Sequence, residues 1–438
     1  MAHANTMLYV TRVSFCVFVL FAMCLLGMLF HARTSARPSA PVIVYQKAAP
    51  CPSAAPVKAV TDVSPPTTPP SSSSSSTRKT TRASFAAPKT SKAEVEQQYH
   101  LFCFFSPSAQ ESATSLDVAQ IPVGLCTHLV YNSVGIDSRG FTLDLEGRGA
   151  EQGAVERFAA FGQPSKLLIS VGRSRHDWRA YQDISSDRQI ARSFGMKLRR
   201  WLHDRNLDGV VIDWPVPATQ RDATELVRQV KRALAGEQLL SVLLPHDQKR
   251  RRSMFDVRRL ATIADFLLFR MYGSHGPHRT EYPITEQDVA FFPKAARSET
   301  GREAFDKACI VLPLSGLSFL RAVSSPSLAP GAPARGPGPA GHQSQKPGSL
   351  AYNELCAANW THVRASHYGT AASRGLIWVG YHDATQLARI VHVLRRRYDA
   401  SCFGLWALED DDFRGSCGAK KFPLVRAVAA ECKAVSTA

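Results

Sequence analysis

Two carboxylates flank an apolar, strand-like run near the middle of the chain, from Leu207 to Pro217. Asp208 stands at its start, Asp213 near its end and Pro215 two residues further on. A carboxylate at the end of a buried strand can take up or deliver a proton, whereas proline has no ionisable atom. Asp213 is therefore the candidate for proton chemistry, and we expect Asp208 to cap the turn into the strand.

Eight short apolar runs alternate with amphipathic helical patterns beyond about residue 101, and this order is typical of repeated βα units. The runs are Leu101–Phe105, His128–Val134, Leu167–Val171, Val210–Trp214, Leu239–Leu244, Phe266–Tyr272, Ile310–Leu314 and Phe403–Leu408. Apolar residues at helical spacing precede two of these runs: Ile190, Phe194, Leu198, Trp201 and Leu202 in one case, Leu387, Ile390, Val391 and Leu394 in the other. The pattern predicts an α/β fold, a (β/α)8 TIM barrel.

Seven motifs occur in an order similar to that of the family 18 glycoside hydrolases, the chitinases and their relatives. They are Cys126–Tyr131, Lys166–Gly172, Asp208–Pro217, Met271–Tyr272 with His275–Gly276, Ala351–Cys356, Trp378–Tyr381 and Asp411–Cys417. The resemblance implies the same barrel, with its chemistry at the C-terminal ends of the strands. It also implies a small α+β insertion after the seventh strand, where Arg321–Leu350 is dense in Pro, Gly and Ser and where Cys356 would lie.

The resemblance further implies that the reaction of the family is lost. Its members use a glutamate after the strand to protonate the glycosidic oxygen, and Pro215 stands at that position. Val211 replaces the middle aspartate of the strand, and Gly273 replaces the carboxylate that follows Tyr272. We therefore expect no catalytic residue and no hydrolysis of chitin.

Aromatic residues that would stack on sugar rings are also depleted, since Ser108, Ser174 and Ser315 stand where the family has aromatic residues. Beside them, Arg173 replaces a glycine of the family and Leu317 an arginine. Asp213, Tyr272 and Trp406 remain as candidate pocket residues. Each could instead serve only the barrel: the two aromatic rings by packing, Asp213 through hydrogen bonds.

Two arginines, Arg173 and Arg270, would bring positive charge towards the mouth of the barrel. One or both could pair with Asp213 and plug the pocket, or could attract an anionic ligand such as a sulfated glycan. Arg270 could also point between the sheet and the helices.

The first functional hypothesis is thus a catalytically inactive chitinase-like protein that recognises a glycan, chitin-like or anionic, or a protein partner. The alternatives are a chitin-hydrolysing glycosidase with a relocated acid and a structural ectodomain. No spacing typical of metal ligands or of a phosphate-binding loop is present, so we expect no metal and no cofactor.

The ends of the chain predict a membrane-anchored protein. A tail over residues 1–12 precedes an uncharged, mostly apolar run over 13–30, long enough to span a bilayer as a signal-anchor. Residues 31–95 form a Pro/Ser/Thr-rich stalk, and 96–438 form the chitinase-like domain. Cleavage of the segment as a signal peptide, giving a secreted protein, is the alternative.

Eight cysteines beyond residue 30 and the sequon at Asn359 suit a lumenal or extracellular C-terminal domain. A net charge of +17 could attract polyanions, but that compartment argues against nucleic acid. The resemblance pairs Cys103 with Cys126 and Cys356 with Cys417. It leaves Cys51, Cys309, Cys402 and Cys432, among which a Cys402–Cys432 bridge is plausible.

A basic run, Lys249–Arg252, follows the fifth predicted strand, on the same rim as the pocket. We interpret it as a solvated loop, with binding of anionic glycans or proteolytic processing as alternatives.

Overall fold

A computed structural model of the chain describes residues 99–107, 116–144, 150–161, 164–172, 174–272, 276, 278–322, 328–356, 359–364 and 366–434. The predicted tail, the membrane segment over 13–30 and the stalk over 31–95 lie outside the described residues. Among the helices that are described, none has the length and apolar character needed to cross a bilayer.

Eight parallel strands close into a barrel, as the apolar runs predict. They are β1 (His100–Phe105), β2 (His128–Asp137), β4 (Lys166–Val171), β5 (Gly209–Ile212), β6 (Leu239–Leu244), β7 (Phe266–Arg270), β8 (Ala308–Pro313) and β15 (Cys402–Trp406). Each pairs with its neighbours, and β1 closes the ring by pairing with both β2 and β15. A short strand, β3 (Thr142–Asp144), extends β2 in the antiparallel sense.

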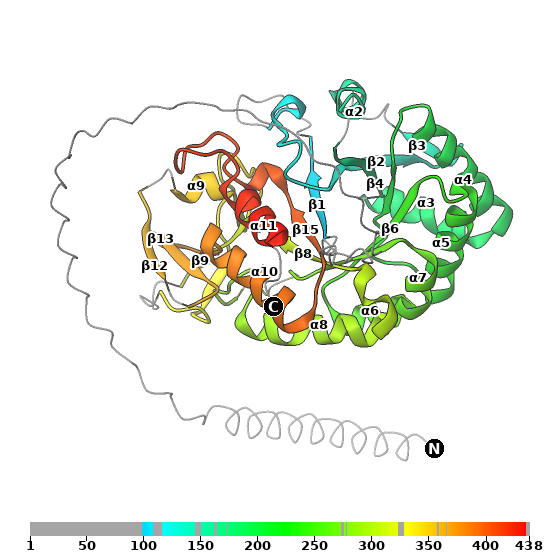
Figure 1. Ribbon diagram of the computed structural model, residues 1–438. Coiled ribbons are helices and arrows are strands. Elements are labelled where there is room, and N and C mark those ends of the chain that lie inside the picture. The colour runs from blue at the N-terminus through cyan, green and yellow to red at the C-terminus, as the bar shows by residue number, and fades with distance from the viewer. Residues whose placement is uncertain are drawn as a thin grey trace, which may run out of the picture. The chain divides into compact units, whose positions relative to one another are not determined.

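Helices cover the outside of the barrel (Figure 1). They are α2 (Ala150–Ala159), α3 (Arg175–Ser186), α4 (Arg188–His203), α5 (Gln220–Leu234), α6 (Gln248–Met254), α7 (Val257–Ile263), α8 (Glu286–Thr300), α10 (Ala384–Tyr398) and α11 (Pro423–Lys433). The apolar faces predicted from helical spacing are buried: Phe194 and Leu198 on α4, Ile390 and Leu394 on α10. Their packing against the sheet forms the larger of two barrel cores.

The second core fills the barrel itself. It contains Phe102 and Phe104 from β1, Val211 from β5 and Val311 from β8, all fully buried. Gly209 at the start of β5 is required by this packing, since a Cβ there would lie 2.4 Å from the carbonyl oxygen of Leu239. Asp208, just before it, accepts hydrogen bonds from the Leu167 backbone N–H (2.8 Å) and the Lys166 ammonium (2.7 Å), in keeping with a structural role.

The expected insertion follows β8 as a six-stranded antiparallel sheet with one short helix. Its elements are β9 (Gly316–Arg321), β10 (Ala334–Pro337), β11 (Ser349–Leu350), α9 (Tyr352–Cys356), β12 (Thr361–Arg364), β13 (Thr370–Arg374) and β14 (Ile377–Tyr381). The chain runs from this sheet directly into α10, and Figure 1 shows β9, β12 and β13 on the opposite side of the barrel from α4 and α5.

The basic run Lys249–Arg252 is helical, so its interpretation as a solvated loop is wrong. Asp247 caps the N-terminus of α6 by accepting from the Arg250 N–H (2.6 Å). Arg251 is fully buried, and its guanidinium donates to both carboxylate oxygens of Glu299 over 2.6 and 3.1 Å. One of the four cations therefore belongs to the core.

Two of the predicted disulfides are confirmed and the third suggestion is wrong. Cys103 is bonded to Cys126 and Cys356 to Cys417. Cys402 is bonded to Cys309 rather than to Cys432, because the register of β8 and β15 places Cys309 and Cys402 side by side, with Cα atoms 4.3 Å apart. Cys432 is a buried free thiol on α11.

Candidate functional site

The strand ends at the mouth of the barrel bring three of the predicted pocket residues together. Asp213 directly follows β5, Arg270 ends β7 and Trp406 ends β15. The Arg270 guanidinium donates to the Asp213 carboxylate over 3.1 Å, and its central carbon lies 4.9 Å from the centre of the Trp406 ring. Arg270 thus points into the mouth, and not between the sheet and the helices.

The ion pair is largely shielded from water. The side chain of Asp213 is 5% exposed and that of Arg270 is 23% exposed. Burial acts to lower the pKa of Arg270, but the charge of Asp213, the interaction with Tyr272 and the hydrogen bond to Asp213 together outweigh it, and the pKa is raised. The guanidinium is therefore permanently charged, and the one predicted proton-transfer carboxylate is engaged in an ion pair.

The two residues that follow Asp213 supply no acid. Trp214 is buried, with its ring stacked on Tyr181 at 5.4 Å between centroids, and Pro215 is half-buried in the loop after β5. Gly172 at the end of β4 permits this packing, since it has a φ of +89° and a Cβ there would lie 2.4 Å from the Tyr181 ring. Val211 lies in the apolar interior of the barrel.

A pocket of about 450 Å³ lies between the mouth and the insertion. Trp406 and Tyr272 line it from the barrel, and Ser315 and Leu317 line it from the start of the insertion. One face of the Trp406 ring has Arg270 over it, and the ring also contacts Phe104 at 4.6 Å between centroids. A sugar ring could not stack on a face of Trp406 that either of these contacts occupies.

Two further carboxylates line this pocket, Glu409 and Asp410, which the sequence interpretation did not single out. Ser106 donates its backbone N–H to Glu409 over 3.1 Å, and the Asn132 amide donates to the Ser106 hydroxyl over 2.9 Å. The acidic run 409–412 immediately after the eighth strand was the available signal, because side chains at that point face the mouth.

The environment of this acidic pair favours protonation. Burial raises the pKa of Glu409 to about 7, and the Asp410 charge adds to the rise. Burial raises the pKa of Asp410 to about 6, against a hydrogen bond from the Ala407 backbone and the charge of Lys346. Groups of this kind can exchange protons near neutral pH.

Not every predicted site residue can be placed. Arg173, Ser108 and Gly273 lie outside the described residues. Asn359 is described and is exposed, as a glycosylation acceptor must be.

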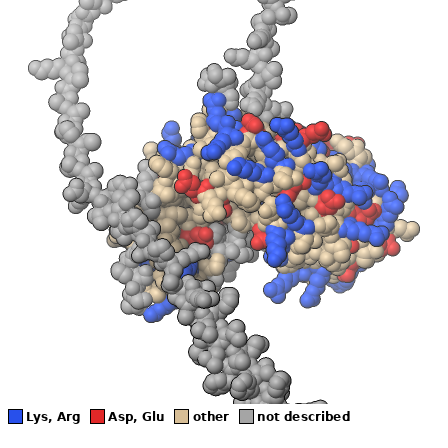
Figure 2. Space-filling model, turned by 90° about the horizontal axis from the view of Figure 1, so that it is seen from below, with Lys and Arg blue, Asp and Glu red and all other residues tan. Residues whose placement is uncertain are grey.

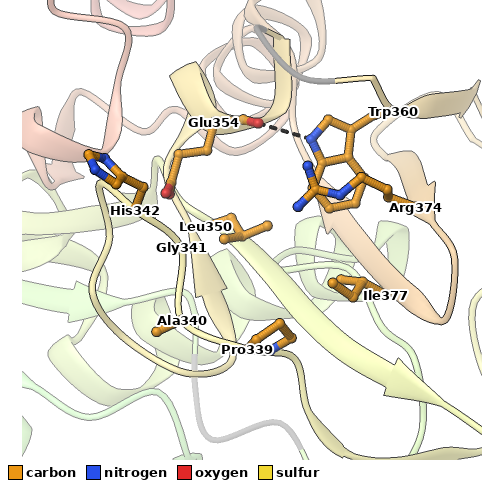
Figure 3. Close-up of a pocket in the computed structure, with 9 residues that line it drawn as sticks. All are labelled: Pro339, Ala340, Gly341, His342, Leu350, Glu354, Trp360, Arg374 and Ile377. Carbon is orange, nitrogen blue, oxygen red and sulfur yellow. Dashed lines mark hydrogen bonds between the residues drawn. The ribbon is translucent and has the colours of Figure 1, made fainter.

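A smaller pocket, of about 320 Å³, lies wholly within the insertion (Figure 3). Its Trp360 side chain donates to the Glu354 carbonyl oxygen over 2.9 Å, and Arg374 lies 4.7 Å over the Trp360 ring. The Glu354 carboxylate accepts backbone N–H groups from Gln343, Ser344 and Ala351. The polar groups of this pocket therefore hold the insertion together.

One grouping has the composition of a metal site: Cys356, Asp412 and Cys417 lie close together. The two sulfur atoms are joined in a disulfide, and Asp412 accepts N–H groups from Gly415, Ser416 and Cys417. A thiolate pair is not available there, so the donor set does not suit a metal ion.

Comparison with known proteins agrees with the fold. Chitinase-3-like protein 2 of Homo sapiens is 24% identical over 363 residues, covering 75% of this chain and 92% of that protein. Probable chitinase 10 of Drosophila melanogaster is 26% identical over 353 residues, which cover 70% of this chain and only 15% of that protein.

Among solved structures, the Group IV chitinase of Ostrinia furnacalis in complex with allosamidin superposes with a TM-score of 0.67 at 22% identity, covering 76% of this chain and 98% of its own. Human YKL-39, described as a pseudo-chitinase with retained chitooligosaccharide binding properties, superposes with a TM-score of 0.65 at 22% identity, covering 76% of this chain and 99% of its own. Residues 100–411 match the profile of the glycosyl hydrolases family 18. With the closed barrel, its insertion and this match over most of its length, the chain belongs to glycosyl hydrolase family 18.

Proposed function

We propose that the domain recognises a glycan at the mouth of its barrel and does not hydrolyse glycosidic bonds. The ion pair between Arg270 and Asp213 carries this proposal. A retaining mechanism needs an acid beside the scissile oxygen and a free carboxylate to hold the reacting group. Here Pro215 follows a carboxylate that is already bound to a guanidinium.

The pocket beside the ion pair supports a role in recognition. Its volume of about 450 Å³ is in the range of sites for small ligands. Hydroxyl and amide groups of Ser106, Ser315, Gln343 and Ser349 line it together with the two aromatic residues, and such groups suit the hydroxyls of a sugar. The likeness to YKL-39 makes oligomers of N-acetylglucosamine the first ligands to test, with an anionic glycan as the second.

A specific observation favours one alternative, hydrolysis by a relocated acid. Glu409 and Asp410 lie in the same pocket as Trp406, and their pKa values of about 7 and about 6 would leave a carboxylic acid available near neutral pH. The remaining hypotheses are a purely structural ectodomain and a domain that binds a protein partner.

One experiment separates these functions. The full chain, in a non-ionic detergent, is incubated with tetra-N-acetylchitotetraose between pH 5 and 8; products are followed by mass spectrometry and binding by calorimetry. We expect binding without cleavage. Cleavage that is lost in Glu409→Gln would establish the relocated acid, and neither binding nor cleavage would leave the structural or protein-binding role.

A matched pair of variants tests the location of binding. Truncating Gln343 and Lys346, which line the pocket, to alanine should weaken binding by about tenfold, the worth of one or two hydrogen bonds. Truncating the exposed residues Lys420 and Lys421 to alanine should leave it unchanged. Equal losses in the two variants would contradict binding in the pocket.

We also propose that residues 13–30 anchor the protein in a membrane with the barrel in the lumen or outside the cell. The three disulfides support an oxidising compartment. Glycosidase treatment should reduce the apparent mass of the protein if Asn359 carries a glycan, and the matched Asn359→Gln variant should lack this shift. A mature N-terminus beyond residue 30 would instead establish secretion after cleavage.

A further inference from the structure

Helix α4 presents an unusually basic face to solvent. Its 16 residues include Arg188, Arg192, Lys197, Arg199 and Arg200 and contain no acidic residue. Four of these cations are exposed and Arg199 is half-buried. Like charges repel one another at this density, so the fold gains nothing from the cluster itself.

Two shallow hollows flank this helix. The residues that line the hollow of about 630 Å³ on the β3 side include Thr142, Arg192, Met196, Lys197 and Arg200. Those that line the hollow of about 650 Å³ on the α5 side include Arg188, Arg192, Met196, Arg199 and Arg232. Arg192 and the 58% exposed Met196 belong to both, so the hollows form one continuous surface over the helix, which we call the α4 surface.

The charge of the α4 surface is largely uncompensated. Arg188 pairs with Glu225 (3.3 Å) and Arg199 with Glu237 (2.9 Å). Arg192, Arg200 and Arg232 form no ion pair with any described carboxylate. Figure 2 shows Lys and Arg over much of the visible face of the domain, including the end where Figure 1 places α4 and α5.

The geometry favours an extended anion over a small one. The cations from Arg188 to Arg200 spread along about 18 Å of helix, at about 1.5 Å per residue. A small anion would require several donors that converge on one point in a shielded cavity, whereas these donors are spread out and exposed. A linear chain with repeated negative groups could contact them in succession, with guanidinium groups suited to paired contacts with oxyanions.

We propose that the α4 surface is a binding site for a sulfated polysaccharide. The three disulfides favour an oxidising compartment, where an extended polyanion is a sulfated carbohydrate rather than a nucleic acid. Neither hollow includes a residue of the barrel-mouth pocket, so this site is independent of the proposed glycan site.

The test measures binding of the full chain, in a non-ionic detergent, to heparin at 0.15 M salt, with unsulfated heparosan as the reference polymer. We expect binding to heparin that weakens steeply as salt is raised, and little binding to heparosan. Reversing three exposed charges, R192E with R200E and R232E, should reduce the affinity for heparin at least tenfold. The matched control reverses three exposed arginines outside the α4 surface, R258E with R259E and R335E, and should change the affinity less than about threefold.

Each other outcome contradicts the proposal. An equal loss in both triple variants would mean that only net charge matters. Tighter binding to vesicles that contain phosphatidylserine than to vesicles of phosphatidylcholine alone, lost in R192E with R200E and R232E and without binding to heparin, would identify an anionic membrane surface as the partner. Absence of binding to heparin by a protein that still shows its native circular dichroism would exclude the site.

Discussion

Arg270 and Asp213 meet across a strand to which neither belongs. Arg270 ends β7 and Asp213 follows β5, and both of these strands pair with β6 between them. The 3.1 Å contact therefore bridges the mouth above β6, and the same guanidinium lies over Trp406 from β15. Three separate parts of the barrel rim are tied together by one side chain.

This bridge predicts a strong dependence of stability on both partners. Arg270→Met should lower the free energy of unfolding by about 3 kcal/mol, because it removes the Arg270 charge from the side of a buried carboxylate. Asp213→Asn should have a similar effect, and the double variant should lose much less than the sum. Urea denaturation of the four proteins gives the coupling energy. As a control, Arg199→Ala, which breaks an ion pair with Glu237 at the surface, should lower the free energy of unfolding by less than about 0.5 kcal/mol. If the losses in the Arg270 and Asp213 single variants add up to the loss in the double variant, the two residues do not stabilise one another.

Restoring the missing acid should not restore activity. In Pro215→Glu, the new carboxyl group would face an Asp213 that is still paired with Arg270, and Val211 would remain apolar. We expect no release of N-acetylglucosamine oligomers above the background of the parent chain. Chromatography of chitin digests measures this, with an active family member as the positive control. Turnover in the single variant would show that the rest of the site is intact.

Glu409 should make stability fall with rising pH. Its pKa is raised from 4.5 to about 7 in the folded chain, so the folded state binds the proton more tightly than the unfolded state. Its contribution is complete below about pH 4.5 and is lost as the pH rises towards 7, by on the order of 1–3 kcal/mol.

The control for this prediction is Glu409→Gln. Burial lowers the pKa of His382 to about 4, so this residue should make stability rise with pH. The contribution of His382 is common to both proteins and cancels in the difference between the unfolding free energies of the parent and the variant. The parent should lose stability relative to the variant between pH 4.5 and 7. A difference that does not change with pH would contradict the raised pKa.

The Cys309–Cys402 disulfide should resist reduction in the folded protein, because both cysteines lie inside the barrel. Peptide mapping without reductant should recover them linked, and Cys432 should react with iodoacetamide only after unfolding. Replacing both bridged cysteines with alanine should cost about 2–5 kcal/mol, while Cys432→Ala, which breaks no bridge, should cost less. Recovery of a Cys402–Cys432 peptide would contradict the register of β8 and β15.

The barrel could be predicted from sequence because its strands are buried on both faces. Runs such as Leu101–Phe105 are continuously apolar for that reason, and continuous runs stand out from amphipathic helices. The insertion and two disulfides could be predicted because the motifs that indicate them occur in the order typical of the family. These features depend on residue type and spacing, which the sequence shows directly.

The corrections concern partners that are distant in sequence. Cys309 and Cys402 are 93 residues apart, and only the strand register brings them together. Arg251 lies within a run of exposed cations, yet its partner Glu299 is 48 residues away on α8. Glu409 and Asp410 were hidden in an acidic run that also contains the structural residues Asp411 and Asp412. The sequence shows the type of each of these residues, but it does not show the neighbour that determines the residue's role.

The Cys309–Cys402 bridge also has a covalent consequence. Between these residues the chain makes the whole insertion sheet and α10, and then returns to the barrel at β15. A protease that cut this segment once, at any point, would release no fragment, since both pieces would remain joined through the sulfur atoms in the interior. The half of the mouth pocket that comes from the insertion would stay attached to the half that comes from the strands, even in a nicked molecule.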